Sequence, residues 1–281
     1  MVCAKVPVYN AMNGVKAMNG LSITYLGQCG FLLDFCDTRI TTDPYLSDYV
    51  DKTCSSEQTP WRRLYSPPAS LENLKPGGIL ISHSHEDHLD PWTLQPYLSK
   101  NASCKIAAPA PECAKIERMG ASSIIYARAE ESFYIGSVKV TPIPCAHTQL
   151  HTDEAGRFRE LSYILEREDI RLFFGGDMSL YDGLDKRLRE ADLSLLLLPV
   201  NGGDAERTSR GIIGNINCTQ AASLAAKLNV PFIPMHHDLY AINGCPWEEI
   251  LHAAEAEGAQ AHLLKPMQTL RLSGTGAVQP D

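Results

Sequence analysis

The apolar positions near the start of the chain recur in short runs rich in branched and aromatic residues, a pattern typical of β-strands. Three such runs follow one another, with glycine or aspartate between them, and predict an antiparallel meander. The next stretch, residues 44–77, contains five prolines and is predicted to be a long loop. Long loops in compact domains are often functional. The three predicted strands are residues 23–26, 31–35 and 39–42.

Strands and helices alternate in the remaining two thirds of the chain. The continuous apolar run 193–198 predicts a strand buried on both faces, and the alanine-rich run 218–228 predicts a helix. Asp90 and Pro91 have the residue types that cap and begin a helix. Further predicted helices are 111–119 and 247–257, and further predicted strands are 78–82, 105–108, 123–126, 132–134, 138–143, 161–165, 170–174, 230–233, 261–264 and 269–272.

This order of elements predicts an α/β fold of layered sheets with helices outside. No low-complexity linker divides residues 21–281, so we expect a single domain there. Residues 1–20 contain the sequence Ala-Met-Asn-Gly twice and are predicted to be a loosely ordered N-terminal extension.

The composition narrows the class of partner. The 281 residues include 25 Lys and Arg against 33 Asp and Glu, a formal charge of −8. This balance argues against a nucleic-acid partner, which usually needs a basic face. No apolar run reaches the ~18 residues that span a bilayer, and the first residues do not resemble a secretory signal, so no membrane partner is expected. The nine cysteines form no Cys-x-x-Cys pair, which favours a reducing, cytoplasmic location.

The sharpest chemical signal is the segment His-Ser-His-Glu-Asp-His, which directly follows the predicted strand 78–82. Residues two apart in extended backbone face the same way, so His83 and His85 can meet at one point. Asp87 and His88 lie in the turn that follows and can reach a neighbouring point. Imidazole and carboxylate groups are ligands that zinc, manganese and iron accept.

Three later residues, His147, Asp177 and His236, each follow an apolar strand. Strand ends are where binding sites gather in open sheets. Two glycines precede Asp177 and would let the backbone approach a metal closely. Together with the first segment these residues make seven candidate ligands, enough for two adjacent divalent cations with open positions.

The order of these ligand-type residues resembles the metallo-β-lactamase superfamily, and the resemblance extends over nearly the whole chain from about Ile23. It implies an αββα sandwich, in which two mixed sheets pack face to face and a dinuclear metal site lies at one edge. The resemblance also implies that His83, His85 and His147 hold the first metal, that Asp87, His88 and His236 hold the second, and that Asp177 bridges them.

Shorter motifs are similar to the L-ascorbate-6-phosphate lactonase branch of that superfamily. This branch is related to bacterial metal-dependent hydrolases and to N-acylphosphatidylethanolamine phospholipase D. Related proteins often carry histidine where Gln28 stands in this chain. The motifs are residues 26–31, 42–44, 175–177, 209–212 and the Pro-x-His-His-Asp segment 234–238, which is the most specific of them.

For some residues the sequence allows two roles. Asp43 either orients a ligand histidine from behind or caps the turn before Pro44. Of the adjacent His236 and His237, the branch pattern favours His236 as the metal ligand, since neighbouring strand residues face opposite ways. His237 is then expected to contact the substrate or to act as an acid. Arg210 is predicted to anchor a phosphate group, with a solvated surface arginine as the equal alternative.

The sequence therefore predicts a metal-dependent hydrolase with two divalent cations, zinc or manganese, iron also being compatible. A hydroxide held between the cations is the expected nucleophile, and Asp87 is expected to orient it. The expected substrate is a lactone or ester of a small phosphorylated metabolite. The alternatives are a phosphodiesterase of the same superfamily, an iron-binding redox protein and a regulatory binder with a vestigial site. The possibility of a homo-oligomer is left open.

Overall fold

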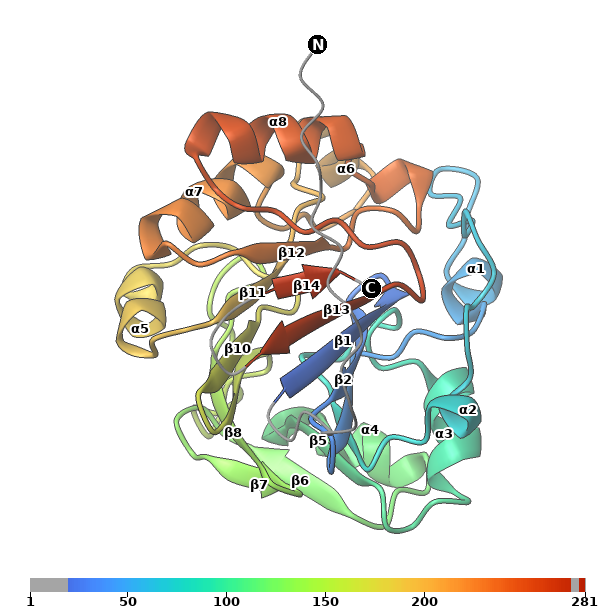
Figure 1. Cartoon of the computed structure of the whole chain (residues 1–281). Coiled ribbons are helices and arrows are strands. Elements are labelled where there is room, and N and C mark those ends of the chain that lie inside the picture. Colours follow the sequence, from blue (N-terminus) through green and yellow to red (C-terminus); the bar gives the residue numbers. More distant parts are fainter. Residues whose placement is uncertain (1–19, 274–277, 281) are drawn as a thin grey trace.

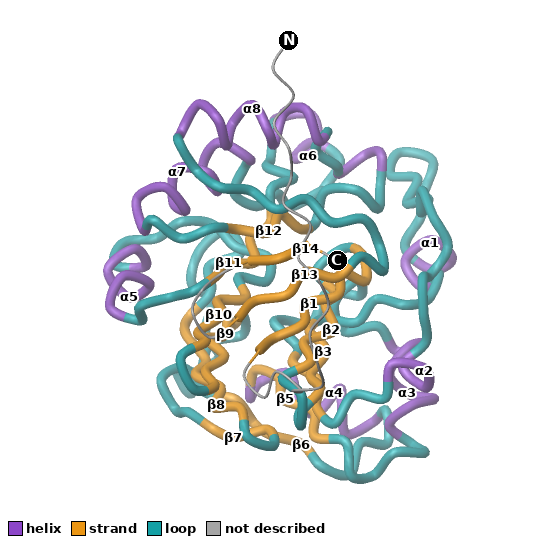
Figure 2. The backbone as a smooth tube through the Cα atoms, in the orientation of Figure 1, coloured by secondary structure: helices purple, strands orange, loops and turns teal. Residues whose placement is uncertain are grey.

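The computed structural model describes residues 20–273 and 278–280. The predicted N-terminal extension lies outside the described residues, apart from Gly20, which begins the first strand. Two mixed β-sheets pack face to face, and helices cover the outer side of each (Figure 1, Figure 2). The αββα sandwich expected from the sequence is therefore confirmed.

The first sheet has eight strands in the order β14–β13–β1–β2–β3–β4–β5–β6. Its strands β1, β2 and β3 pair antiparallel, as the meander prediction requires, whereas β3 to β6 pair parallel. The strands are β1 (Gly20–Gly27), β2 (Gly30–Asp34), β3 (Arg39–Thr42), β4 (Gly78–Leu80), β5 (Lys105–Pro109), β6 (Ile124–Ala127), β13 (Thr269–Ser273) and β14 (Val278–Pro280).

The second sheet has six strands in the order β12–β11–β10–β9–β8–β7. Its strands β9 and β10 form the predicted antiparallel hairpin, and β10, β11 and β12 run parallel. The strands are β7 (Phe133–Ile135), β8 (Val138–Pro144), β9 (Leu161–Arg167), β10 (Ile170–Phe174), β11 (Leu195–Pro199) and β12 (Phe232–Met235).

Strand β11 shows why its sequence is continuously apolar. Leu195 and Leu197 pack in the core between the sheets, whereas Leu196 and Leu198 pack under the helices outside. Because strand side chains alternate between the two faces, a strand covered on both sides needs apolar residues at every position. The predicted double burial of this strand is confirmed.

The helices form the two outer layers. Leu224 of α7 and Ile250 of α8 cover the six-stranded sheet, and Leu94 of α3 and Ile116 of α4 cover the eight-stranded sheet. The helices are α1 (Tyr49–Thr53), α2 (Leu71–Leu74), α3 (Pro91–Leu98), α4 (Cys113–Arg118), α5 (Leu184–Glu190), α6 (Ala205–Ser209), α7 (Cys218–Leu228) and α8 (Trp247–Glu257), with short 3-10 turns at Ala110–Glu112 and Ala241–Asn243.

The structure differs from the predicted helices and strands in a few places. The predicted loop 44–77 contains α1 and α2, and α5 and α6 were not predicted, because helices of four to seven residues are too short to show a clear apolar period. The predicted strand 261–264 is instead irregular, with a single bridge from Ala261 to Phe232. In the described part of the chain, no helix is both long and apolar enough to cross a bilayer.

The two sheets meet at one edge, where strands β1, β3, β4, β8, β10 and β12 all end. The backbone N–H of Leu161 donates to the Ser82 carbonyl over 2.9 Å, and that of His236 donates to the Gln28 carbonyl over 2.8 Å. The first bond joins the loop after β4 of the first sheet to the start of β9 in the second sheet. The second bond joins the turn after β1 of the first sheet to the segment after β12 in the second sheet. The loops at this edge are thereby fixed against one another.

Candidate metal centre

The loops at this edge bring together the seven residues that the sequence predicted as ligands. They come from four strand ends that lie far apart in the sequence. The segment after β4 provides His83, His85, Asp87 and His88, the loop after β8 provides His147, the loop after β10 provides Asp177, and β12 is followed directly by His236.

One group of donor atoms belongs to His83, His85, His147 and Asp177, and all four atoms lie within 4.8 Å of one another. The Nε2 atom of His83 lies 2.9 Å from Nδ1 of His85, and Nε2 of His147 lies 3.4 Å from Oδ2 of Asp177. Three imidazoles and one carboxylate at this spacing fit a zinc-type cation.

A second group lies on the other side of Asp177. Its carboxylate oxygens are 3.4 Å from Nε2 of His88 and 3.3 Å from Nε2 of His236. The Oδ2 atom of Asp87 is 3.6 Å from the His88 ring nitrogen and 3.5 Å from that of His236. Asp177 therefore contacts histidines of both groups, and its predicted bridging role stays a prediction.

Asp43 supports both groups from below. This wholly buried carboxylate is 2.7 Å from Nδ1 of His88, and it accepts hydrogen bonds from the Ser82 backbone N–H at 2.7 Å and the Ser82 hydroxyl at 2.5 Å. The Ser82 hydroxyl in turn lies 2.9 Å from Nδ1 of His83. Of the two roles predicted for Asp43, the contact that orients a histidine is the one present in the structure.

The buried carboxylates make this edge attractive to positive charge. Burial opposes the charged form of His88, but Asp177, Asp87 and Asp43 together raise its pKa well above the usual value. Burial likewise opposes ionisation of Asp177, but His236 and His88 hold its pKa well below the usual value. The Nε2 atom of His88 is buried without a hydrogen-bond partner among the described residues. Divalent cations would balance the charge of the carboxylates and give this nitrogen a partner.

The second of the two glycines before Asp177 allows a close contact between two loops. Gly176 has φ +63, and a Cβ atom there would lie 2.7 Å from the Cβ of Ser82. The small size of Gly176 therefore lets the loop after β10 approach the loop after β4, whereas a Cβ atom at Gly175 would lie 2.7 Å from the Met178 sulfur. The approach of the two loops places Asp177 in contact with histidines of both groups.

Local backbone geometry decides which of two adjacent histidines faces the cluster. His236 has φ 58, a left-handed conformation that turns the chain sharply after β12. The following Asp238 accepts hydrogen bonds from Tyr25 at 2.7 Å and Tyr65 at 3.0 Å, which fixes the turn. His236 points into the centre, whereas His237 packs parallel to the Tyr25 ring at 6.3 Å.

Gln28 and Cys29 also belong to this centre, although the sequence did not predict them as parts of it. The Nε2 atom of Gln28 lies 2.6 Å from Oδ2 of Asp87 and 2.9 Å from Nε2 of His236. The Cys29 thiol donates to Oδ1 of Asp177 over 3.6 Å. The available signal was their place in the 26–31 motif, directly after a predicted strand.

A pocket of about 210 Å³ opens above the two groups. Its floor includes His85, Asp87 and Asp177, so the candidate ligands are accessible from outside. Its lining also includes an apolar wall, which comes partly from the loop 44–77. The apolar wall residues are Val50, Trp61, Ile212, Ile213 and Tyr240.

A family comparison decides the evolutionary relationship. Residues 38–237 match the model of the beta-lactamase superfamily domain, a span that holds all seven candidate ligands. The chain belongs to the metallo-β-lactamase superfamily.

Relatives within the superfamily are distant. A metal-dependent hydrolase of Thermus thermophilus is 24% identical over 255 residues, which cover 90% of this chain and 99% of the relative. A mitochondrial N-acyl-phosphatidylethanolamine-hydrolysing phospholipase D of Saccharomyces cerevisiae is 36% identical over 101 residues, 35% of this chain and 18% of that enzyme. A metallo hydrolase from Ignicoccus hospitalis has the same fold, with a TM-score of 0.68 at 17% identity, and covers 90% of this chain and 99% of its own.

Two residues predicted to contact substrate lie outside the pocket of this superfamily member. His237 is buried, and neither ring nitrogen has a hydrogen-bond partner among the described residues; burial lowers its pKa. Arg210 is exposed and its guanidinium pairs with Glu206 on α6, although the next residues, Gly211 and Ile212, line the pocket. The geometry therefore supports neither a catalytic acid at His237 nor a phosphate anchor at Arg210.

Proposed function

We propose that this protein is a metal-dependent hydrolase that opens a lactone or cleaves an ester at its carbonyl carbon. One observation carries the proposal. Two ligand groups share Asp177 and form the floor of one pocket, with His85, Asp87 and His147 exposed to its interior. A substrate held in this pocket would have its reacting bond directly above both groups.

The ligand groups divide into two sets of residues around one carboxylate. His83, His85 and His147 would hold one divalent cation, and His88 and His236, with Asp87, the other. When bound, two such cations supply a water that is nucleophilic near neutral pH and stabilise negative charge that develops on a carbonyl oxygen. Histidine and carboxylate donors are compatible with zinc, manganese or iron.

The protein's own residues position the reactants. Asp87 lines the pocket, and the Gln28 amide holds its Oδ2 atom at 2.6 Å, so this carboxylate is fixed for accepting a proton or orienting a water. Asp43 fixes the ring of His88 from behind. Such fixed geometry lowers the barrier because little reorganisation is needed during the reaction.

The pocket wall favours a neutral substrate. Trp61, Ile212 and Tyr240 offer apolar surface, and the pocket also contains the acidic Glu86. No lysine or arginine of the described residues lines it. A phosphate group held away from the two cations would meet apolar side chains and Glu86 rather than a lysine or arginine. We therefore propose a lactone or ester with a neutral, apolar substituent in place of the phosphorylated metabolite expected from the sequence.

A phosphodiester is the second candidate substrate. Its support is the local similarity to the yeast phospholipase D, which is 36% identical over 101 residues. A phosphodiester carries a single negative charge, and a long acyl substituent would suit the apolar wall. The same pair of cations would serve this reaction.

A substrate panel with metal analysis tests the proposal. Purified protein is analysed for bound metals and assayed with neutral lactones and aryl esters, phosphorylated sugar lactones and an aryl phosphodiester. Asp177→Asn should lose metal and all hydrolysis together, and His252→Ala, on the exposed face of α8, is the control. Hydrolysis of esters or lactones that does not depend on Asp177 would contradict the proposal. Activity confined to the phosphodiester would support the second candidate instead.

A further inference from the structure

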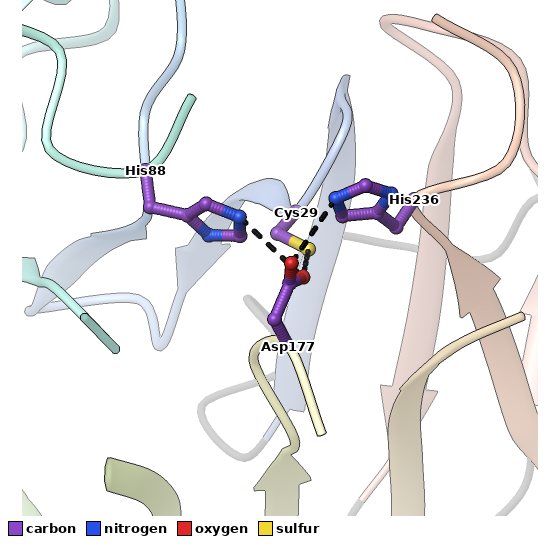
Figure 3. A group of neighbouring side chains, drawn as sticks. All are labelled: Cys29, His88, Asp177 and His236. Carbon is purple, nitrogen blue, oxygen red and sulfur yellow. Dashed lines mark hydrogen bonds and ion pairs between the residues drawn. The ribbon is translucent and has the colours of Figure 1, made fainter. Parts of the chain in front are cut away.

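We propose that Cys29 is a sulfur ligand of the cation held by His88 and His236, and that it makes this position selective for zinc over manganese. The inference rests on the metal centre of the proposed function and adds a residue to it. Figure 3 shows the Cys29 sulfur directed at the same point as the His88 and His236 rings and the Asp177 carboxylate. The four donor atoms lie within 4.8 Å of one another, and all four residues are buried.

The spacing of these atoms fits one cation. Zinc bonds of about 2.0 Å to nitrogen and oxygen and about 2.3 Å to sulfur give tetrahedral ligand-to-ligand edges of roughly 3.3–3.8 Å. The measured edges to Asp177 are 3.6 Å from the Cys29 sulfur, 3.4 Å from Nε2 of His88 and 3.3 Å from Nε2 of His236. The three edges to Asp177 therefore match those of a zinc site, and the remaining ligand atoms lie within 4.8 Å of one another.

The environment of Cys29 differs from that of other buried cysteines. Cys113 and Cys145 place their sulfur atoms near backbone carbonyl oxygens, as ordinary buried thiols do. The Cys29 sulfur instead has a side-chain carboxylate as its hydrogen-bond acceptor. Beside it, Nε2 of His88 is completely buried and has no partner in the described structure. A buried thiol next to an orphaned imidazole nitrogen and a carboxylate is the arrangement that a metal would complete.

The backbone holds Cys29 in this position. It lies in the tight turn between β1 and β2, where Gly27 and Gln28 both have positive φ. Its carbonyl accepts a hydrogen bond of 3.0 Å from the Thr42 hydroxyl, and the Gln28 carbonyl accepts one of 2.8 Å from His236. The turn is thus tied to the strand before Asp43 and to the ligand His236.

Sulfur coordination has a chemical consequence. Thiolate is a soft ligand that suits zinc, whereas manganese prefers oxygen donors. The His83, His85 and His147 group contains no sulfur. The two positions should therefore differ in selectivity, with zinc favoured where Cys29 contributes.

Cobalt(II) substitution tests the inference directly. The protein is stripped with a chelator, reconstituted with two equivalents of Co(II), and its absorption spectrum is recorded. A thiolate ligand should produce an intense near-ultraviolet charge-transfer band that Cys29→Ser lacks. In competition titrations, this variant should also bind zinc at least about 10-fold more weakly at its weaker site. Loss of a residue that only supports a metal ligand already weakens binding by about this factor, and loss of a ligand should cost no less. Its affinity for manganese should change much less.

Two control variants test two other buried cysteines. Cys113→Ser changes a buried thiol that belongs to neither ligand group and contacts backbone carbonyl oxygens, so it should retain the band. Cys245→Ser removes a second group of metal-binding type, Cys218, Cys245 and Glu249, and should also retain it. If Cys29→Ser does not fold, the wild-type spectrum still tests the proposal, because a wild type without the band overturns it.

The outcomes separate this inference from the proposed function. A band that is absent from the wild type, persists in Cys29→Ser or disappears in Cys245→Ser overturns the role of Cys29. Failure to bind cobalt at all overturns both the role of Cys29 and the metal centre. If the band depends on Cys29 but the protein hydrolyses none of the substrates, the ligand assignment stands and the proposed function fails.

Discussion

The Asp43 carboxylate lies 2.7 Å from Nδ1 of His88, with both side chains completely buried. This contact leaves Nε2 of the ring directed at Asp177, 3.4 Å away. A carboxylate behind a ligand imidazole fixes the tautomer and the orientation of the ring and increases its basicity. Asp43 is therefore a positioning residue for the metal centre, since it does not line the pocket itself.

Asp43→Asn should weaken metal binding about 10- to 100-fold, the usual effect of losing such a partner. An amide has one acceptor oxygen and cannot serve His88 and Ser82 as the carboxylate does. Zinc titration against a competing chelator measures the affinity, and saturating metal should restore much of the activity. A loss of activity that saturating metal leaves untouched would mean that Asp43 acts on more than metal affinity.

Removal of the metals should lower the thermal stability as well as the activity. Bound ligand at 100 times its dissociation constant stabilises a fold by about 2.7 kcal/mol, which corresponds to a shift in Tm of about 5 °C for a domain of this size. Calorimetry before and after treatment with a chelator measures the shift, and added zinc should reverse it. An unchanged Tm in the metal-depleted protein would contradict a structural contribution of bound metal.

The sequence predicted the layers of the fold because the apolar patterns are strong. The side chains of β11 alternate between two cores, as its continuous apolar run predicts. Asp90 caps α3 and accepts a hydrogen bond of 2.9 Å from the Trp92 N–H, as its residue type predicts. The seven candidate ligands were also predicted, because each follows an apolar strand and their order resembles the superfamily. Local pattern and family order therefore point to the same edge of the sandwich.

The roles of residues around the ligands depend on contacts that sequence spacing does not contain. Cys29 reaches Asp177, 148 positions away in the sequence, through the packing of the two sheets. His237 faces away from the pocket because of the left-handed turn at His236. Short helices such as α1 were missed, although α1 brings Val50 to the pocket wall. Side-chain direction in irregular segments is thus what the sequence could not supply.

The apolar wall should determine how large a substrate is accepted. Trp61 lines the pocket and packs edge-on against Tyr240, with ring centroids 5.1 Å apart. Trp61→Ala should lower kcat/KM for an aryl or long-chain ester about 10-fold, the lower end of what one hydrophobic contact contributes to discrimination. The effect on an acetate ester should be smaller.

A matched tryptophan separates the pocket contact from general effects on stability. Trp92 is about half exposed on α3 and does not line the pocket. Trp92→Ala should therefore leave the ratio of the two kcat/KM values unchanged. Equal losses for both esters in Trp61→Ala would indicate that Trp61 supports the fold and does not select the substrate.

A substitution of Arg210 tests whether the substrate carries a phosphate group that this residue anchors. Its guanidinium is exposed and pairs with Glu206 of α6, four residues earlier in the chain, and such surface pairs contribute little to stability. Because the side chain lies outside the pocket lining, Arg210→Ala should change KM equally, and by less than about twofold, for a phosphorylated lactone and its neutral analogue. Arg128→Ala is the control, since Arg128 is likewise exposed and lies 3.9 Å from Glu131. A rise in KM confined to the phosphorylated lactone, and absent from the control, would reinstate Arg210 as a phosphate anchor and overturn the neutral substrate proposed from the pocket wall.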